Sequence, residues 1–182
     1  SAICVSLLKL LFPELSLTLH NSYGLPTNYD KTKTLLILNS YSGNTEETLD
    51  AFDRGQKEGA AMAILSRGGI LIQKGKEFMV PYIELQESNL EPRFSIGHQL
   101  ISLLTLMGEI DKIRTLREKV ALVQTEKANT LGKELSHKLS ATYPIIYSGA
   151  GFYPVAYLIK AAINEGAKVP CFVNQLPEAN HN

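Results

Sequence analysis

Several features that mark large classes of protein are missing from this chain of 182 residues. Its basic and acidic side chains balance to a formal net charge of +0, so no strong field attracts a polyanion such as nucleic acid. Its longest apolar stretches are shorter than the roughly 20 residues that a membrane-spanning helix needs, and no secretory signal segment is apparent. These absences predict a cytoplasmic protein without a nucleic-acid or membrane partner.

Cysteine and histidine are also scarce. Cys4 and Cys171 stand far apart, without a Cys-x-x-Cys pair or a neighbouring histidine at metal-ligand spacing, which favours two buried thiols in a reducing compartment. The four histidines share no metal-binding spacing with one another. The sequence therefore predicts no metal site.

What the chain does contain is a polar turn between an apolar strand and an amphipathic helix. Residues 39–48 read Asn-Ser-Tyr-Ser-Gly-Asn-Thr-Glu-Glu-Thr, and the apolar run from Leu35 to Leu38 leads into them. Three hydroxyl side chains are candidates for binding a ligand: Ser40, Ser42 and Thr45. The first N–H groups of a helix lack intrahelical partners and carry partial positive charge, so such a turn can surround an anion with donors. The pattern predicts a phosphate site.

The turn has no lysine or arginine, and this absence narrows the kind of phosphate. A P-loop needs Gly-Lys-Ser/Thr to hold the terminal phosphates and Mg²⁺, whereas Gly43 is followed by Asn44. A single sugar phosphate therefore fits better than a nucleotide triphosphate. The alternative is an ordinary strand-to-helix turn in which Ser42 or Asn44 only caps the helix.

Extended and helical patterns alternate along the chain. We expect helices over residues 1–12, 46–59, 94–107 and 153–164, and strands over 15–19, 35–38, 60–65, 80–85 and 144–147, with a further apolar segment at 169–176. Strands that are apolar on both faces and alternate with helices indicate a parallel sheet covered on both sides, with ligands outside the carboxyl ends of the strands. The predicted fold class is α/β, with doubly wound parallel sheets and flanking helices.

The pattern changes twice, which predicts three parts. Residues 1–108 form a first domain that ends at Gly108. Residues 109–140 become highly charged and predict an exposed helical linker. Residues 141–182 begin a second domain on the same plan, but about 40 residues are too few to bury a sheet of their own. We therefore expect a nearly complete first domain and a partial second one.

Two charged residues that follow prolines are candidates for chemistry. Glu178 follows Pro177 just after an apolar segment, where partial burial would raise its pKa toward neutrality and suit it to act as a base. The alternative is a loop carboxylate in solvent. Arg93 follows Pro92 before an apolar helix, so its guanidinium is expected to project over the phosphate end of the first sheet. Here the alternative is an arginine that caps a surface loop.

Residues 40–48, 91–93 and 177–182 together resemble sugar isomerase (SIS) domains, and among these most of all the bifunctional phosphoglucose/phosphomannose isomerases. The resemblance spans most of the chain and implies a flavodoxin-like SIS fold. It also implies an aldose–ketose isomerase that interconverts glucose 6-phosphate or mannose 6-phosphate with fructose 6-phosphate through an enediolate. No metal or cofactor is implied, and the assembly implied is a homodimer.

The same resemblance implies roles for single residues. The implied phosphate-binding set consists of Ser1, Ser40, Ser42 and Thr45. Ser1 matches the last residue of a Gly-Gly-Ser turn in the family, and those glycines are absent here. Glu178 matches the base, and Arg93 matches an arginine that faces the substrate. The ring-opening histidine of the family would lie past Asn182. We therefore expect His181 only to help orient its loop.

The resemblance further implies that this chain is a fragment that lacks both ends, and we expect residues 1–182 alone to have no isomerase activity. Two alternatives stay open. SIS domains also serve as non-catalytic, sugar-phosphate-binding regulatory modules, which keep the hydroxyl turn but need neither Glu178 nor Arg93. An amino-sugar phosphate isomerase or synthase domain shares the turn as well.

Overall fold

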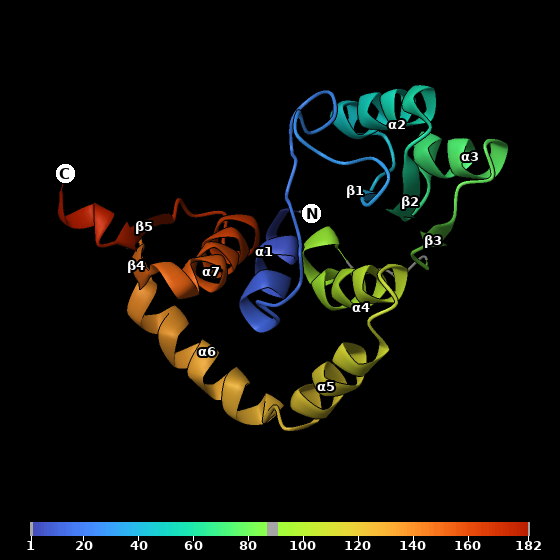
Figure 1. Ribbon diagram of the computed structural model, residues 1–182. Coiled ribbons are helices and arrows are strands. Elements are labelled where there is room, and N and C mark those ends of the chain that lie inside the picture. Colours follow the sequence, from blue (N-terminus) through green and yellow to red (C-terminus); the bar gives the residue numbers. More distant parts are fainter. Residues whose placement is uncertain (1, 87–90, 182) are drawn as a thin grey trace. The chain divides into compact units, whose positions relative to one another are not determined.

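The computed structural model describes residues 2–86 and 91–181, which divide into two compact units (Figure 1). Unit 1 consists of Ser1–Val5 and Ser16–Ile113, and unit 2 consists of Ser6–Leu15 and Arg114–Asn182. Ser1, one of the predicted phosphate ligands, lies outside the described residues. Within the described part, no helix is long and apolar enough to cross a membrane.

A parallel sheet organises the described part of unit 1. Its strands lie in the order β1 (Leu35–Ser40), β2 (Ala61–Ser66) and β3 (Tyr82–Glu84). Helix α2 (Glu46–Glu58) joins β1 to β2, and α3 (Gly69–Glu77) joins β2 to β3. Helical crossovers are needed because a tight hairpin can join only antiparallel strands. The carboxyl ends of all three strands therefore meet at one edge of the sheet.

Both faces of this sheet are buried. On one face a core cluster joins strand residues such as Leu38 and Ile64 to Phe52 of α2 and Leu71 of α3. Burying a side chain of this size contributes roughly 1.5–3 kcal/mol, so the cluster fixes both helices on the sheet. On the other face Leu65 is fully buried as well. The predicted α/β class, with parallel strands flanked by helices, is confirmed.

The end of unit 1 is helical. A short 3-10 turn, η1 (Pro92–Phe94), leads into α4 (Ile96–Leu106), which contacts β2. Helix α1 (Ala2–Leu11) brings Cys4 of this unit to the buried Gln99 of α4, where the thiol donates to the amide oxygen over 3.8 Å. Both cysteines of the chain are buried and free, as predicted.

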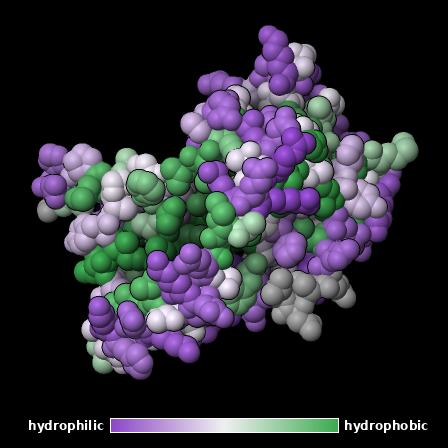
Figure 2. Space-filling model, turned by 90° about the horizontal axis from the view of Figure 1, so that it is seen from below, coloured by the Kyte–Doolittle hydropathy of each residue, from purple (hydrophilic) through white to green (hydrophobic). Residues whose placement is uncertain are grey.

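Unit 2 repeats the strand–helix–strand plan on a smaller scale. Strands β4 (Ile145–Gly149) and β5 (Phe172–Leu176) are parallel, and η2 (Ala150–Phe152) and α7 (Tyr153–Gly166) connect them. The 3-10 turn η3 (Glu178–Asn180) follows β5. The large hydrophobic side chains left exposed on this sheet are Ile145, Tyr147 and Phe172. Figure 2 shows apolar side chains among the polar ones on the surface that it presents.

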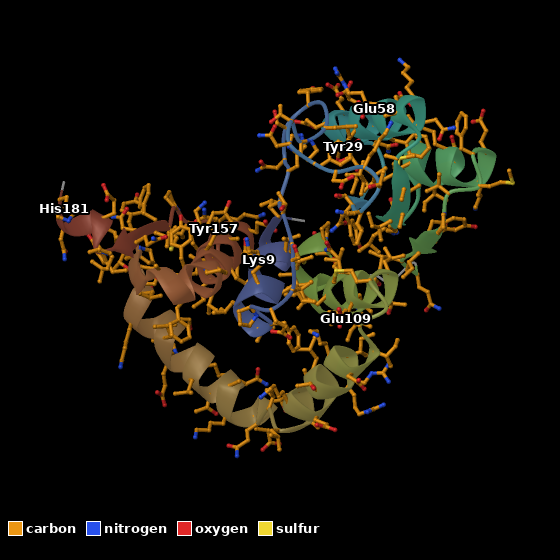
Figure 3. The ribbon with its side chains drawn as sticks, in the orientation of Figure 1. Lys9, Tyr29, Glu58, Glu109, Tyr157 and His181 are labelled. Atoms are coloured by element: carbon orange, nitrogen blue, oxygen red, sulfur yellow. The ribbon has the colours of Figure 1, made fainter. Side chains whose placement is uncertain are left out.

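Two expectations about local structure are wrong. Residues 15–19 alternate like a strand but form none, because no strand in the described part of the chain pairs with them and Leu19 is exposed. The segment that follows is held as a loop on α2: Tyr29 donates to Glu58 over 2.9 Å (Figure 3), and the Gly24 N–H donates to Asp50 over 2.6 Å.

The single helix expected over residues 109–140 is divided into two. Helix α5 (Ile110–Ala121) and helix α6 (Thr125–Leu139) are separated by a short break at residues 122–124. Ile113 of α5 is buried, whereas α6 has no buried residue in the described chain. The exposure predicted for this charged segment is therefore confirmed for α6, but α5 also packs against other residues.

Candidate functional site

The predicted hydroxyl turn lies at the carboxyl end of β1 and leads into α2. Ser40, the last residue of the strand, is 5% exposed, and its Oγ lies 2.7 Å from the Thr45 Oγ1. The Gly43 N–H donates to the Ser40 Oγ over 3.1 Å, and the Asn44 N–H donates to the Ser42 Oγ over 3.2 Å. The structure therefore gathers all three predicted hydroxyls in one turn. The hydroxyls of Ser40 and Thr45 are hydrogen-bonded to each other.

Neither residue named in the capping alternative caps α2. Thr45 is the N-cap residue and gives the helix no side-chain hydrogen bond. The Asn44 Oδ1 instead accepts from the Ile70 N–H, in the first turn of α3, over 3.1 Å. Among the described residues, the N-cap side chain thus leaves the first N–H groups of α2 uncapped, and a helix N-terminus in this state can bind an anion.

Acidic residues in the first turn of α2 repel a bound phosphate. Glu46 and Glu47 both lie there. The Tyr23 hydroxyl donates to the Glu46 carboxylate over 2.9 Å, and this bond raises the pKa of Tyr23. Tyr23 thereby holds one of the two carboxylates. The N-terminus of a helix stabilises one nearby negative charge by only about 0.3–1 kcal/mol. Most of the affinity for phosphate must therefore come from the hydroxyl donors.

A second turn, Ser66–Gly69 at the end of β2, is interlocked with the first. The Arg67 N–H donates to the Tyr41 carbonyl, and the Leu71 N–H donates to the Gly43 carbonyl, each over 3.0 Å. Gly43 has a φ of +72°, and a Cβ at this position would lie 1.8 Å from the Gly68 carbonyl oxygen. Only glycine fits there, because the two backbones approach too closely for any side chain. The hydroxyl turn is therefore held by its own hydrogen bonds and by those from the turn after β2.

Sequence reasoning missed two residues beside this turn. Arg67 is exposed, and its backbone N–H bonds to Tyr41 of the hydroxyl turn, so a cationic residue lies on the neighbouring turn. Asn39 precedes Ser40 in β1, so by the alternation of a strand it points to the opposite face of the sheet. Its side-chain nitrogen and oxygen are both buried, and neither has a hydrogen-bond partner among residues 2–86 and 91–181. The sequence offered one indication that Asn39 is unusual, which is its place as a polar residue near the end of an apolar strand.

Replacing Asn39 with leucine is expected to stabilise the protein. A buried polar group without a partner costs about 1–3 kcal/mol, and leucine has a similar size without that cost. Since 1 kcal/mol moves the midpoint of a chain of this size by about 2–4 °C, we expect thermal denaturation to shift upward by roughly 2–12 °C. Asn39→Asp is the control, because a buried charge should lower the midpoint. A lower midpoint for Asn39→Leu would mean that a buried water satisfies the amide.

The other two predicted residues lie in short 3-10 turns. Arg93, in η1, has its Nη1 3.3 Å from the Glu91 Oε2 and its Cζ 5.0 Å from the centre of the Phe94 ring, with 27% of the side chain exposed. Glu178 opens η3 and is exposed, so the predicted partial burial is wrong for the described chain. The reason is that η3 follows an edge strand of a two-stranded sheet. Arg93 shares unit 1 with the hydroxyl turn, and Glu178 belongs to unit 2.

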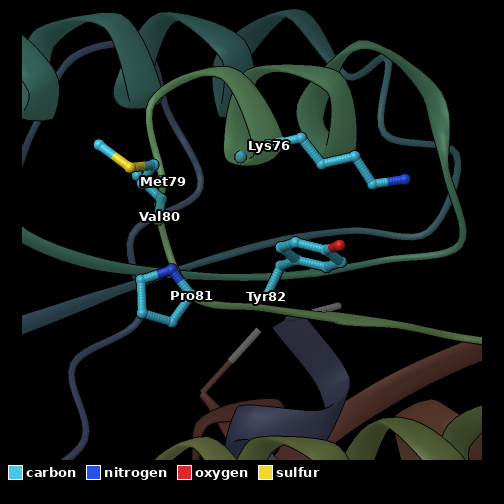
Figure 4. A pocket seen from close by; sticks show the side chains of 6 residues that line it. Lys76, Met79, Val80, Pro81 and Tyr82 are labelled. Atoms are coloured by element: carbon cyan, nitrogen blue, oxygen red, sulfur yellow. The ribbon is translucent and has the colours of Figure 1, made fainter.

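Elsewhere the described residues offer little that resembles a ligand site. An open pocket of about 390 Å³ lies where α3 ends and β3 begins, which is the opposite edge of the sheet from the hydroxyl turn (Figure 4). Lys76 lines it, but its Nζ lies 5.7 Å from the centre of the Tyr82 ring and 3.6 Å from Glu84. Among the described residues, no three His, Cys, Asp or Glu side chains are grouped to hold a metal ion.

Comparison with known proteins shows which enzymes the chain is similar to. Residues 128–182 match the family described as the bacterial phospho-glucose isomerase C-terminal SIS domain. Curated relatives named bifunctional phosphoglucose/phosphomannose isomerase include that of Thermoplasma volcanium, which is 33% identical over 180 residues and matches 94% of this chain and 55% of the relative. The D-glucosamine-6-phosphate 4-epimerase of Sulfolobus acidocaldarius is 30% identical over 194 residues, with 100% of this chain and 59% of the relative matched.

A solved structure carries the same fold. The C-terminal domain of glucosamine-fructose-6-phosphate aminotransferase from Francisella tularensis superposes with a TM-score of 0.57 at 16% identity, over 81% of this chain and 46% of that chain. This likeness concerns the fold alone. The chain spans about half the length of the curated relatives that it matches. With the hydroxyl turn in its place on a parallel sheet, the chain is thus similar over most of its length to the bifunctional phosphoglucose/phosphomannose isomerases, and residues 128–182 match a SIS domain of phospho-glucose isomerases.

Proposed function

We propose that this protein is an aldose–ketose isomerase that interconverts glucose 6-phosphate and mannose 6-phosphate with fructose 6-phosphate. The observation that carries the proposal is the Ser40–Thr45 turn, which gathers three hydroxyls before an uncapped helix at the carboxyl end of a parallel strand. The names of the relatives support the same reaction. We further propose that the protein works in the cytoplasm as a homodimer, as the family resemblance implies.

The hydroxyl turn would hold the phosphate of the substrate. Each hydroxyl can donate one hydrogen bond to a phosphate oxygen, and the N-terminus of α2 adds partial positive charge. The bond between Ser40 and Thr45 uses only one of their two protons, so one remains for the ligand. Arg67 on the interlocked turn would add long-range attraction. This donor set suits a monoester phosphate on a neutral sugar.

The chemistry needs a base and a group that stabilises negative oxygen. A base removes the proton from C2 of the open-chain aldose, which leaves an enediolate with its negative charge on O1. The hydroxyl proton of O2 passes to O1, and the base returns its proton to C1, which gives the ketose. We assign the base to Glu178. Arg93 would stabilise the enediolate oxygen, because a guanidinium presents several N–H donors and is always charged. Its pair with Glu91, which is 60% exposed, is of the kind worth at most about 1 kcal/mol, so a bound substrate can displace it.

The test of this function is a substrate panel on the full-length protein. We expect glucose 6-phosphate and mannose 6-phosphate both to yield fructose 6-phosphate, measured by an enzyme-coupled assay, while glucosamine 6-phosphate is left unchanged. Epimerisation of glucosamine 6-phosphate would instead favour the activity named for the Sulfolobus acidocaldarius relative. Binding of all three sugars without any turnover would favour the regulatory module.

Arg67 provides a smaller prediction about the same site. Arg67→Gln should weaken binding of fructose 6-phosphate about two- to fivefold at low salt, because it removes an exposed charge beside the turn. The loss should shrink as salt is added. Lys57→Gln is the matched control, because Lys57 lies in the last turn of α2, roughly 17 Å along the helix from its first turn. Titration calorimetry at two salt concentrations measures both variants. Equal losses for Arg67→Gln and Lys57→Gln would show that only the net charge matters.

A further inference from the structure

Helix α4 begins with a buried pair of polar side chains. Ser95 and Gln99 are each 3% exposed, and they lie one turn apart on the same face of the helix. The Gln99 Nε2 donates to the Ser95 Oγ over 2.8 Å, and the Ser95 Oγ–H donates to the Pro92 carbonyl over 2.6 Å. The two side chains thus form a directed chain of hydrogen bonds that ends on the backbone of η1.

Both ends of this chain are fixed. At the far end, the buried Cys4 thiol donates to the Gln99 Oε1 over 3.8 Å. At the near end, the Pro92 carbonyl accepts a second bond, from the Ser95 N–H, over 3.1 Å. The carbonyl that precedes Arg93 is therefore held by two donors of one residue. A shift of this carbonyl would break both bonds at once.

Stability alone is a poor reason for such a chain at this place. Apolar side chains of similar size would fill a buried helix face without the cost of removing polar groups from water. A fully bonded buried polar network instead specifies one geometry. The element whose geometry it specifies is η1, a turn of only three residues with Arg93 in the middle. The direction in which the Arg93 side chain leaves the backbone is set by this turn.

We propose that Ser95 and Gln99 are positioning residues that hold Arg93 in register for catalysis. The proposal rests on the proposed function, in which Arg93 stabilises the enediolate oxygen. Ser95 and Gln99 do not touch the substrate. They fix the carbonyl before Arg93, and a displacement of a catalytic group by about 1 Å can cost roughly 10²-fold in rate. Their effect should therefore fall on turnover and depend on the presence of Arg93.

A double-mutant cycle on the full-length isomerase tests this dependence. We expect Ser95→Ala to lower kcat by about 10- to 100-fold with KM changed less than about threefold, and Ser95→Thr to recover most of the rate because it keeps a hydroxyl. In an Arg93→Ala background, Ser95→Ala should lower kcat by no more than about twofold further. Ser102→Ala is the control, since it removes another buried hydroxyl two turns along α4 and should leave kcat near the parent value.

Gln99→Met guards against loss of folding, because it removes the bond to Ser95 while keeping the length of the side chain. It should lower kcat in the same range while thermal denaturation remains cooperative. An equal loss from Ser95→Ala with and without Arg93 would overturn the positioning role, as would parent-like kcat in both Ser95→Ala and Gln99→Met. Parent-like kcat in Arg93→Ala would be a different failure, because it removes Arg93 from the proposed reaction itself.

Discussion

Replacing Glu178 with glutamine is expected to lower turnover by about 10²- to 10⁴-fold while substrate binding stays nearly unchanged. This is the range found when a positioned general base is removed. The amide keeps the shape of the carboxylate but cannot accept the proton from C2. The measurement is fructose 6-phosphate formation from glucose 6-phosphate by the full-length protein, together with the dissociation constant for fructose 6-phosphate from calorimetry.

The matched control is Glu134→Gln, which neutralises another exposed glutamate of unit 2, on α6. It should leave both turnover and binding near the parent values. Turnover at the parent rate in Glu178→Gln would show that Glu178 is a structural residue of its loop and that the base lies elsewhere. A loss of binding as large as the loss of turnover would point to a role in holding the substrate.

The second large effect is expected from alanine at Gly43. A Cβ there would lie 1.8 Å from the Gly68 carbonyl oxygen and 2.8 Å from the Ser66 Oγ, so the two turns must separate. The closest clash is between the added Cβ and a backbone carbonyl, which cannot move aside as a flexible side chain can. We expect at least about a 100-fold loss of affinity for fructose 6-phosphate, because separation moves the hydroxyls and the N-terminus of α2 apart.

Gly59→Ala isolates the cause of that loss. Gly59 ends α2 with a φ of +66°, close to the +72° of Gly43, but a Cβ there meets no atom within 4 Å. It should therefore lower stability by about 1 kcal/mol, the cost of the left-handed conformation, and leave affinity unchanged. The two variants are compared by thermal denaturation and by calorimetry. Parent-like affinity in Gly43→Ala would mean that the interlocking of the turns is unimportant for binding.

The parts of the fold that could be predicted are those fixed by local sequence. Helix α2 ends where Gly59 supplies a left-handed residue, and β1 and β2 follow apolar runs that only a covered sheet accepts. Residues 15–19 also alternate like a strand, yet strand formation requires a neighbour, and local pattern does not reveal whether one is present. The break between α5 and α6 was also missed. Residues 122–124 contain neither glycine nor proline, so the local sequence does not mark the end of a helix there.

The same distinction applies to the site. Ser40, Ser42 and Thr45 lie within six consecutive residues, so one turn brings them together and their spacing was enough to predict it. Arg67 reaches this turn only because β1 and β2 pair in parallel, with Ser40 opposite Ser66. Burial likewise depends on distant parts of the chain, which is why the exposure of Glu178 was predicted wrongly. The resemblance to the phosphoglucose/phosphomannose isomerases was recognised from three short motifs, and the comparisons confirm this resemblance.

A crystal structure of the protein soaked in saturating fructose 6-phosphate tests most directly whether the hydroxyl turn binds the substrate's phosphate. We expect phosphate density in the turn after β1, with phosphate oxygens within hydrogen-bond distance of the hydroxyls of Ser40, Ser42 and Thr45 and facing the N-terminus of α2. Fructose 6-phosphate bound elsewhere, with this turn empty at saturation, would contradict it.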